Sequence, residues 1–101
     1  MAAFDLIILD GTVATGADVM TSDVGIKAGR IVALGFELGT AAAEIDARGK
    51  LVLPGGIDSH VHIDQPSGPD IVQSDDFESG TRSAVFGGNT TVIPFCLQER
   101  G

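Results

Sequence analysis

Short runs of hydrophobic residues, each closed by small or polar residues, fill the first half of the chain. The run Phe4-Asp5-Leu6-Ile7-Ile8-Leu9 is rich in strand-forming residues and is followed by Asp10-Gly11, a dipeptide typical of turns. Thr12 and Val13 are therefore expected to begin a return strand, and residues 14–22 are expected to form a loop. No helical periodicity occurs in this region.

Two further strand pairs are predicted before residue 54. Residues 23–27 and 30–34 form a hairpin joined through Ala28-Gly29, where glycine provides the positive φ that a tight turn needs. Residues 35–43 are small and flexible in character, and residues 44–46 and 50–53 are expected to pair with each other around Ala47-Arg48-Gly49. The first 53 residues therefore predict a set of short antiparallel strands.

The pattern changes after Pro54-Gly55-Gly56, where strict alternation from residue 57 to 63 predicts one strand. Successive side chains of a strand point to opposite faces, so this strand has one apolar and one polar face. The apolar face carries Ile57, Val61 and Ile63 with the small Ser59, and the polar face carries Asp58, His60, His62 and Asp64.

A loop, a helix and a second strand follow. Pro66, Gly68 and Pro69 predict the loop, and Ser74 or Asp75 is expected to cap a helix that runs to about Phe86. Asp75 and Glu78 fit a capping box, and residues 90–97 predict the second strand, with Pro94 marking a bulge or a strand edge. The helix is expected to pack on the sheet through Phe77, Thr81, Ala84 and Val85, with Phe86 on its opposite face. Strand, helix and strand form a β-α-β unit with parallel strands.

His60 and His62, the two histidines of the chain, are candidate metal ligands. Residues two apart on a strand lie about 6.6 Å apart along it, so both imidazoles can bind one ion. Imidazole nitrogen suits zinc and its neighbours in the periodic table. The alternative is a polar strand face without a metal. Their position at the C-terminal end of a predicted strand, where β/α barrels place functional residues, favours the metal.

Composition limits the class of partner. The chain has 14 Asp and Glu against 6 Lys and Arg, a formal net charge of −8, which argues against binding nucleic acid or an anionic membrane surface. No apolar run is long enough to span a bilayer. The single cysteine, Cys96, is expected to be a small buried apolar residue, and its lack of a disulfide partner favours a cytoplasmic protein.

Residues 51–62, Leu-Val-Leu-Pro-Gly-Gly-Ile-Asp-Ser-His-Val-His, resemble the first barrel strand of the cyclic amidohydrolase branch of the amidohydrolase superfamily. The runs at 74–82 and 87–91 resemble dihydropyrimidinases and hydantoinases. The resemblance implies a mixed β and α/β fold. Residues 1–53 would form the N-terminal part of a small β-sandwich, and residues 54–101 the first β-α-β unit of a TIM-type (β/α)8 barrel.

The resemblance also implies a site and a reaction. Such enzymes open cyclic amide or imide rings with two divalent ions, usually zinc, bridged by a carboxylated lysine and a hydroxide. His60 and His62 match the ligands of the more buried ion, while the bridging lysine, the other histidines and the proton-shuttling aspartate have no counterpart here. The loop after the first strand makes Ile63, Asp64 and Gln65 candidates for substrate binding. The chain is therefore expected to be the N-terminal piece of a longer enzyme, commonly a homo-oligomer (a tetramer), and to be inactive alone.

Three alternatives were weighed. Dihydroorotases carry an arginine two residues after the second histidine, where this chain has Asp64, and are disfavoured. An allantoinase-like hydrolase stays open, although residues 75–81 fit hydantoinases better. A non-enzymatic, truncated interaction module that keeps the motif without the chemistry also stays open.

Overall fold

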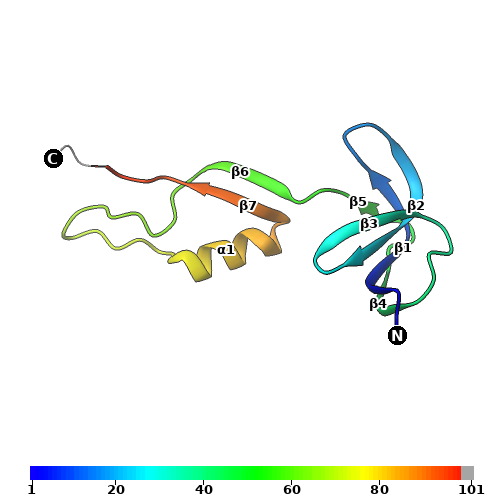
Figure 1. The fold of residues 1–101 in the computed structure, drawn as a ribbon. Coiled ribbons are helices and arrows are strands. Elements are labelled where there is room, and N and C mark those ends of the chain that lie inside the picture. The colour runs from blue at the N-terminus through cyan, green and yellow to red at the C-terminus, as the bar shows by residue number, and fades with distance from the viewer. Residues whose placement is uncertain (99–101) are drawn as a thin grey trace. The chain divides into compact units, whose positions relative to one another are not determined.

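The computed structural model describes residues 1–98, and the chain divides into two compact units, Met1–Pro54 and Gly55–Gly101 (Figure 1). The first unit contains five strands: β1 (Phe4–Ala14), β2 (Val19–Lys27), β3 (Arg30–Gly35), β4 (Ala41–Asp46) and β5 (Leu51–Val52). The second contains β6 (Gly56–Val61), α1 (Phe77–Phe86) and β7 (Asn89–Pro94). No helix among residues 1–98 combines the length and the hydropathy needed to cross a membrane.

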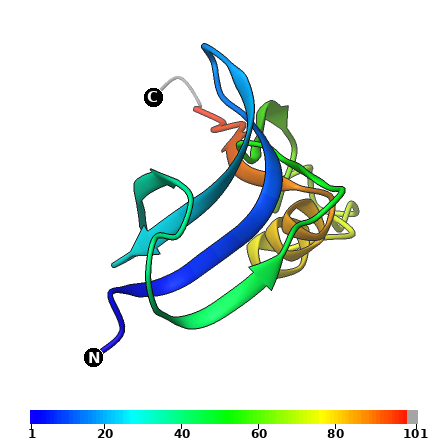
Figure 2. The same cartoon turned by 90° about the vertical axis from the view of Figure 1, so that its right-hand side faces the viewer.

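The five strands of the first unit form one mixed sheet. Its order is β3-β2-β1-β4, and β5 also pairs with β1, the central blue strand in Figure 2. The hairpin of β2 and β3 is confirmed, with Ala28 and Gly29 at φ 50° and 71° in its turn. The buried core consists of Ile7, Val13, Val24 and Ala47.

The prediction that the first strand ends at Asp10-Gly11 is wrong, because β1 continues to Ala14. The two residues form an irregularity instead: the register with β2 shifts between Ile8 and Gly11, and Asp10 has φ 55°. The Asp10 N–H donates to Oδ1 of the buried Asp23 at 2.9 Å, which replaces a ladder hydrogen bond. A turn dipeptide therefore marks a β-bulge here.

The predicted pairing of residues 44–46 with 50–53 is also wrong. β4 and β5 lie along the same edge of β1, and both run parallel to it, so the first unit is not an all-antiparallel set. The turn between β4 and β5 lies beside the β-bulge of β1. There the Ala47 N–H donates to Leu9 O at 2.9 Å and the Thr12 N–H donates to Lys50 O at 3.0 Å. The predicted loop at 14–22 is shorter than expected, because β2 begins at Val19.

The β-α-β unit with parallel strands is confirmed in the second unit, where β6 pairs with β7. Both strands are shorter than predicted. β6 ends at Val61, so His62 and Ile63 follow the strand, and β7 ends at Pro94. Pro94 lies opposite Val61 after a register shift, which agrees with its expected place at a bulge or a strand edge.

The N-cap of helix α1 lies one or two residues later than expected. It is Asp76, which forms a capping box with Ser79 rather than Asp75 with Glu78. Hydrogen bonds from the backbone N–H and the hydroxyl of Ser79 hold the pKa of Asp76 below its ordinary value of 3.8. Glu78 and Arg82, four residues apart on the helix, form an ion pair with Oε1 and Nη1 3.7 Å apart.

The face by which α1 packs differs in part from the prediction. Thr81 and Ala84 are half-buried, but Phe77 and Val85 are exposed. Gly80 approaches Ile63 closely, because a Cβ at residue 80 would lie 3.1 Å from Cγ2 of Ile63. Phe86 is 85% exposed, as its place on the opposite face predicted.

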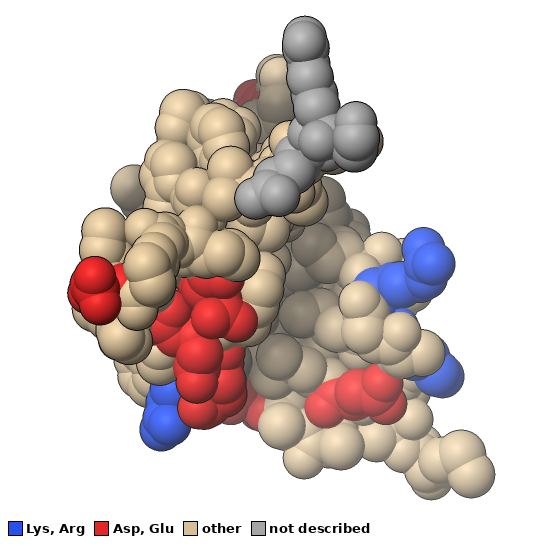
Figure 3. Space-filling model, turned by 90° about the vertical axis from the view of Figure 1, so that its left-hand side faces the viewer, with Lys and Arg blue, Asp and Glu red and all other residues tan. Residues whose placement is uncertain are grey.

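The surface of the described residues is strongly acidic. Every Asp and Glu among residues 1–98 is exposed except Asp23 and Asp58, and several are visible in red in Figure 3. Cys96 is exposed, so its expected burial is wrong.

Candidate metal centre

The two histidines lie together at the C-terminal end of β6. His60 is within the strand and His62 follows its last residue, and their ring centroids are 5.4 Å apart. Both rings contact Phe95, each at a centroid distance of 4.7 Å. The shared contact places both imidazoles on the same side of the strand, as the alternation of the sequence predicted.

This spacing fits two nitrogen ligands on one zinc ion. With Zn–N bonds of about 2.0–2.1 Å at a tetrahedral angle, the centroids of two bound imidazoles lie about 5 Å apart. The observed centroid distance of 5.4 Å is close to this value. Both side chains are exposed, so the nitrogens are accessible to an ion.

Two polar side chains beside the histidines already make hydrogen bonds. Oδ1 of Asp58 accepts from the His60 N–H at 3.1 Å, which ties this carboxylate to the backbone. Nδ1 of His62 is hydrogen-bonded to Oε1 of Gln65. Within residues 1–98 no group of three or more His, Cys, Asp or Glu residues is arranged to hold a metal ion. Within this part of the chain, the two imidazoles are therefore the candidate ligands.

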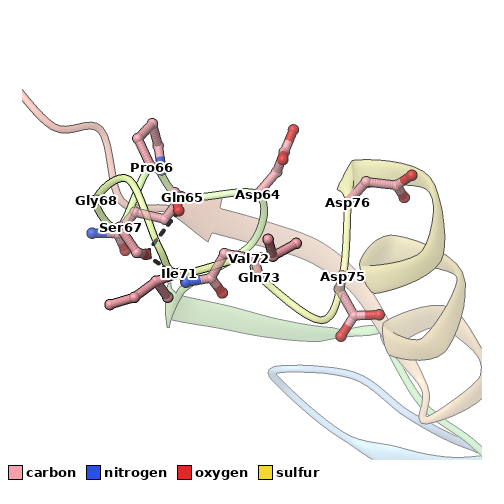
Figure 4. A pocket seen from close by; sticks show the side chains of 10 residues that line it. All are labelled: Asp64, Gln65, Pro66, Ser67, Gly68, Ile71, Val72, Gln73, Asp75 and Asp76. Carbon is pink, nitrogen blue, oxygen red and sulfur yellow. Dashed lines mark hydrogen bonds between the residues drawn. The ribbon is translucent and has the colours of Figure 1, made fainter.

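The loop between β6 and α1 forms an open pocket of about 450 Å³ (Figure 4). Asp64, at φ 50°, turns the chain away from the strand, and its N–H donates to Asp75 O at 3.3 Å, which joins the two ends of the loop. The pocket is lined by Asp64, Gln65, Pro66, Ser67, Gly68, Ile71, Val72, Gln73, Asp75 and Asp76.

Of the three candidate substrate-binding residues, Asp64 and Gln65 line this pocket and Ile63 does not. Ile63 is only 5% exposed and packs against α1 at Gly80. Its alternation with His62 turns it to the other side of the chain, where it holds the helix. Ile63 therefore belongs to the packing of the unit.

Sequence reasoning missed the contact of Phe95 with the histidines. In the sequence, Phe95 stands out only as one of residues 90–97, which predict the second strand. Its N–H donates to Val61 O at 3.1 Å, which extends the pairing of the two parallel strands and brings its ring beside His60 and His62. The signal was present, because an aromatic residue at the C-terminal end of the neighbouring parallel strand must lie near the end of β6.

Known proteins resemble this chain closely over nearly its whole length. It is 48% identical over 96 residues to a D-hydantoinase of Geobacillus stearothermophilus, covering 94% of this chain and 20% of that enzyme. It is 45% identical over 96 residues to an allantoinase of Bacillus licheniformis, covering 95% of this chain and 21% of that enzyme. The chain thus spans about a fifth of the length of these curated relatives. No protein-family model matches it.

Solved structures give the same result. A D-hydantoinase structure superposes with a TM-score of 0.90 at 43% identity, covering 97% of this chain and 21% of the other. A dihydropyrimidinase from Brevibacillus agri superposes with a TM-score of 0.85 at 46% identity, covering 94% and 21%. In sequence and in fold, the chain is similar to a segment that makes up about a fifth of a D-hydantoinase and of a dihydropyrimidinase.

Proposed function

We propose that the chain is the N-terminal part of a metal-dependent cyclic amidohydrolase, which hydrolyses the ring amide or imide bond of a hydantoin or dihydropyrimidine. The observation that carries the proposal is the pair His60 and His62, with ring centroids 5.4 Å apart, in a chain 48% identical to a D-hydantoinase. By itself the chain is expected to be inactive.

His60 and His62 would hold one divalent ion, zinc by preference, through one imidazole nitrogen each. A bound zinc ion supplies a water of lowered pKa and polarises a carbonyl oxygen. The role of this chain is to fix the two imidazoles and to place the loop with Asp64 and Gln65 beside them. The structure of an N-acyl-D-glutamate deacylase from Bordetella bronchiseptica, described as complexed with zinc, matches 60% of this chain with a TM-score of 0.55 and 41% identity. That likeness supports zinc as the first ion to test.

The two units would be parts of larger architectures in the intact protein. The β6-α1-β7 unit is proposed as the first of a (β/α)8 barrel, whose later strands bring the bridging lysine, the further histidines and the proton-transferring aspartate. The sheet of the first unit carries an apolar groove of about 440 Å³, lined by aliphatic residues that include Ile8, Val24 and Ile31. The apolar lining of this groove is an argument that a second sheet packs on it and completes a β-sandwich in the intact protein.

Zinc content of the intact natural protein and of two variants tests the metal ligands. His60→Ala and His62→Ala should each lose roughly one equivalent of zinc and most activity, because each removes a direct bond. Ser59→Ala, on the opposite side of the same strand, is the control and should keep both. Unchanged metal content in the two histidine variants would refute the assignment.

Turnover measurements separate the candidate activities. The zinc-loaded intact protein should open hydantoin or dihydrouracil. Allantoin is assayed beside them, because the identity to an allantoinase, 45%, is close to that to the D-hydantoinase, 48%. Faster hydrolysis of allantoin would assign the allantoinase branch. No turnover of any ring by the zinc-loaded protein would favour the non-enzymatic module. A homo-oligomeric state and a cytoplasmic location are part of the same proposal.

A further inference from the structure

Gln65 makes a contact that a purely substrate-binding role does not explain. Its side-chain oxygen, Oε1, is hydrogen-bonded to Nδ1 of His62. An amide oxygen can only accept a hydrogen bond, so Nδ1 of His62 carries the proton and Nε2 carries the lone pair. The contact therefore selects one of the two neutral tautomers of His62 and leaves Nε2 as the nitrogen available to an ion.

Phe95 fixes the same imidazole from another direction. The ring of His62 stacks on the ring of Phe95 with an interplanar angle of 8° and a centroid distance of 4.7 Å. Phe95 is itself anchored, because its N–H donates to Val61 O at 3.1 Å. Contact on the ring face and a hydrogen bond at Nδ1 together restrict rotation of the imidazole.

The loop holds the backbone of Gln65 in place. Its carbonyl oxygen accepts from Oγ of Ser67 at 3.0 Å, and Oγ of Ser67 accepts from Nε2 of Gln73 at 2.8 Å (dashed lines in Figure 4). Asp64, the preceding residue, is tied to Asp75 through its N–H. The amide of Gln65 thus starts from an ordered backbone, which lowers the entropy lost when its side chain contacts His62.

We propose that Gln65 is a positioning residue for the metal centre: its amide oxygen holds His62 in the tautomer and orientation in which Nε2 binds the ion. The proposal rests on the proposed function, because it takes His62 to be a ligand. It assigns Gln65 a role through His62, in place of the contact with substrate that its position in the loop predicted.

Two substitutions of similar length test it in the intact protein. Gln65→Met removes the acceptor, whereas Gln65→Glu keeps an acceptor at the same place. Partners of metal-bound histidines contribute about 10–100-fold to affinity, so Gln65→Met should weaken zinc binding by about that factor in a competition titration with a chromophoric chelator. Gln65→Glu should retain the affinity of the natural protein.

A second measurement reads the tautomer without a metal or a substrate. In the metal-free protein labelled with 15N-histidine, the resonances of His62 are assigned by their absence in His62→Ala. They should show the Nδ1–H tautomer in the natural protein and in Gln65→Glu, and a mixture of the two tautomers in Gln65→Met. A purely structural role of Gln65 would not change this signature.

Gln98→Met is the matched control, because it makes the same substitution at an exposed residue outside the hydrogen bonds that hold Gln65. Equal losses in Gln98→Met and Gln65→Met, or in Gln65→Glu and Gln65→Met, would overturn the proposal, as would unchanged zinc affinity and tautomer in Gln65→Met. If zinc affinity is unchanged in Gln65→Met but zinc is lost in His62→Ala, the positioning role fails and the metal site stands. If His62→Ala also retains zinc, the proposed function itself fails.

Discussion

Gly11→Ala should loosen the contact between β5 and β1. A Cβ at residue 11 would lie 2.5 Å from Cγ2 of Val52 and 3.2 Å from Cβ of Ala47, so one of these side chains must move. Overpacking of this kind costs about 1–3 kcal/mol, and removing a glycine from a strand returns about 0.5–1 kcal/mol. The net destabilisation should be about 1–2 kcal/mol, carried by the two-residue strand β5.

Amide hydrogen exchange in the intact protein measures this loss locally. The Thr12 N–H, which donates to Lys50 O at 3.0 Å, reports the pairing of the two strands. A loss of 1–2 kcal/mol corresponds to exchange about 5–30-fold faster in peptides covering residues 10–14 and 50–53. Gly16→Ala is the control, because a Cβ there would meet no atom within 4 Å.

A double substitution isolates the cause. Val52→Ala removes the methyl group that Gly11→Ala would strike, so the double variant should be less destabilised than the sum of the two single variants, by more than about 0.5 kcal/mol. Exchange in Gly11→Ala no faster than in Gly16→Ala, or strictly additive effects of Gly11→Ala and Val52→Ala, would refute the steric explanation.

Three further predictions concern the second unit and the isolated chain. Asp76→Ala should speed amide exchange in the first turn of α1, whereas Asp76→Asn keeps the acceptor; equal exchange in both would contradict the cap. Because hydrogen bonds from Ser79 lower the pKa of Asp76, the charged cap should be complete above pH 3.8 and lost only as the pH falls through that lowered pKa. The isolated 101-residue chain with added zinc should open no hydantoin or dihydrouracil ring, and turnover by purified material would show otherwise. Light scattering should also show that the isolated chain self-associates, because Ile57, Phe86 and Ile93 are 68%, 85% and 54% exposed. Burying a few hundred Å² of apolar surface is worth several kcal/mol at about 25 cal/mol per Å². A monomer at all concentrations would contradict this prediction.

Features that depend on neighbours in sequence could be predicted. The turn at Ala28-Gly29, the ion pair of Glu78 with Arg82 and the order of β6, α1 and β7 all follow from local conformation and spacing. The choice of strand partner could not. Alternation shows which residues share a face, but it does not show that β4 and β5 both pair with β1, because that choice depends on residues more than 30 positions away.

In the candidate site, too, features set by sequence neighbours could be predicted and features set by the path of a loop could not. Alternation along the strand placed His60 and His62 on one side, and their ring contact agrees with it. The contact of Gln65 with His62 could not be predicted, because it depends on the path of the loop after Asp64 turns at φ 50°. Asp10-Gly11 was misread for a related reason: a glycine required by the close approach of Val52 has the same sequence signal as a glycine in a turn.

The hydrogen bond from Asp64 N–H to Asp75 O has an evolutionary consequence. It fastens the loop at its base, so that residues 66–74 leave and rejoin the unit at adjacent points. Insertions, deletions and exchanges at the tip of the loop, between Ser67 and Gln73, can accumulate without displacing His62 or the start of α1. Descendants of one ancestral gene can therefore diversify in what they accept while inheriting the same two histidines.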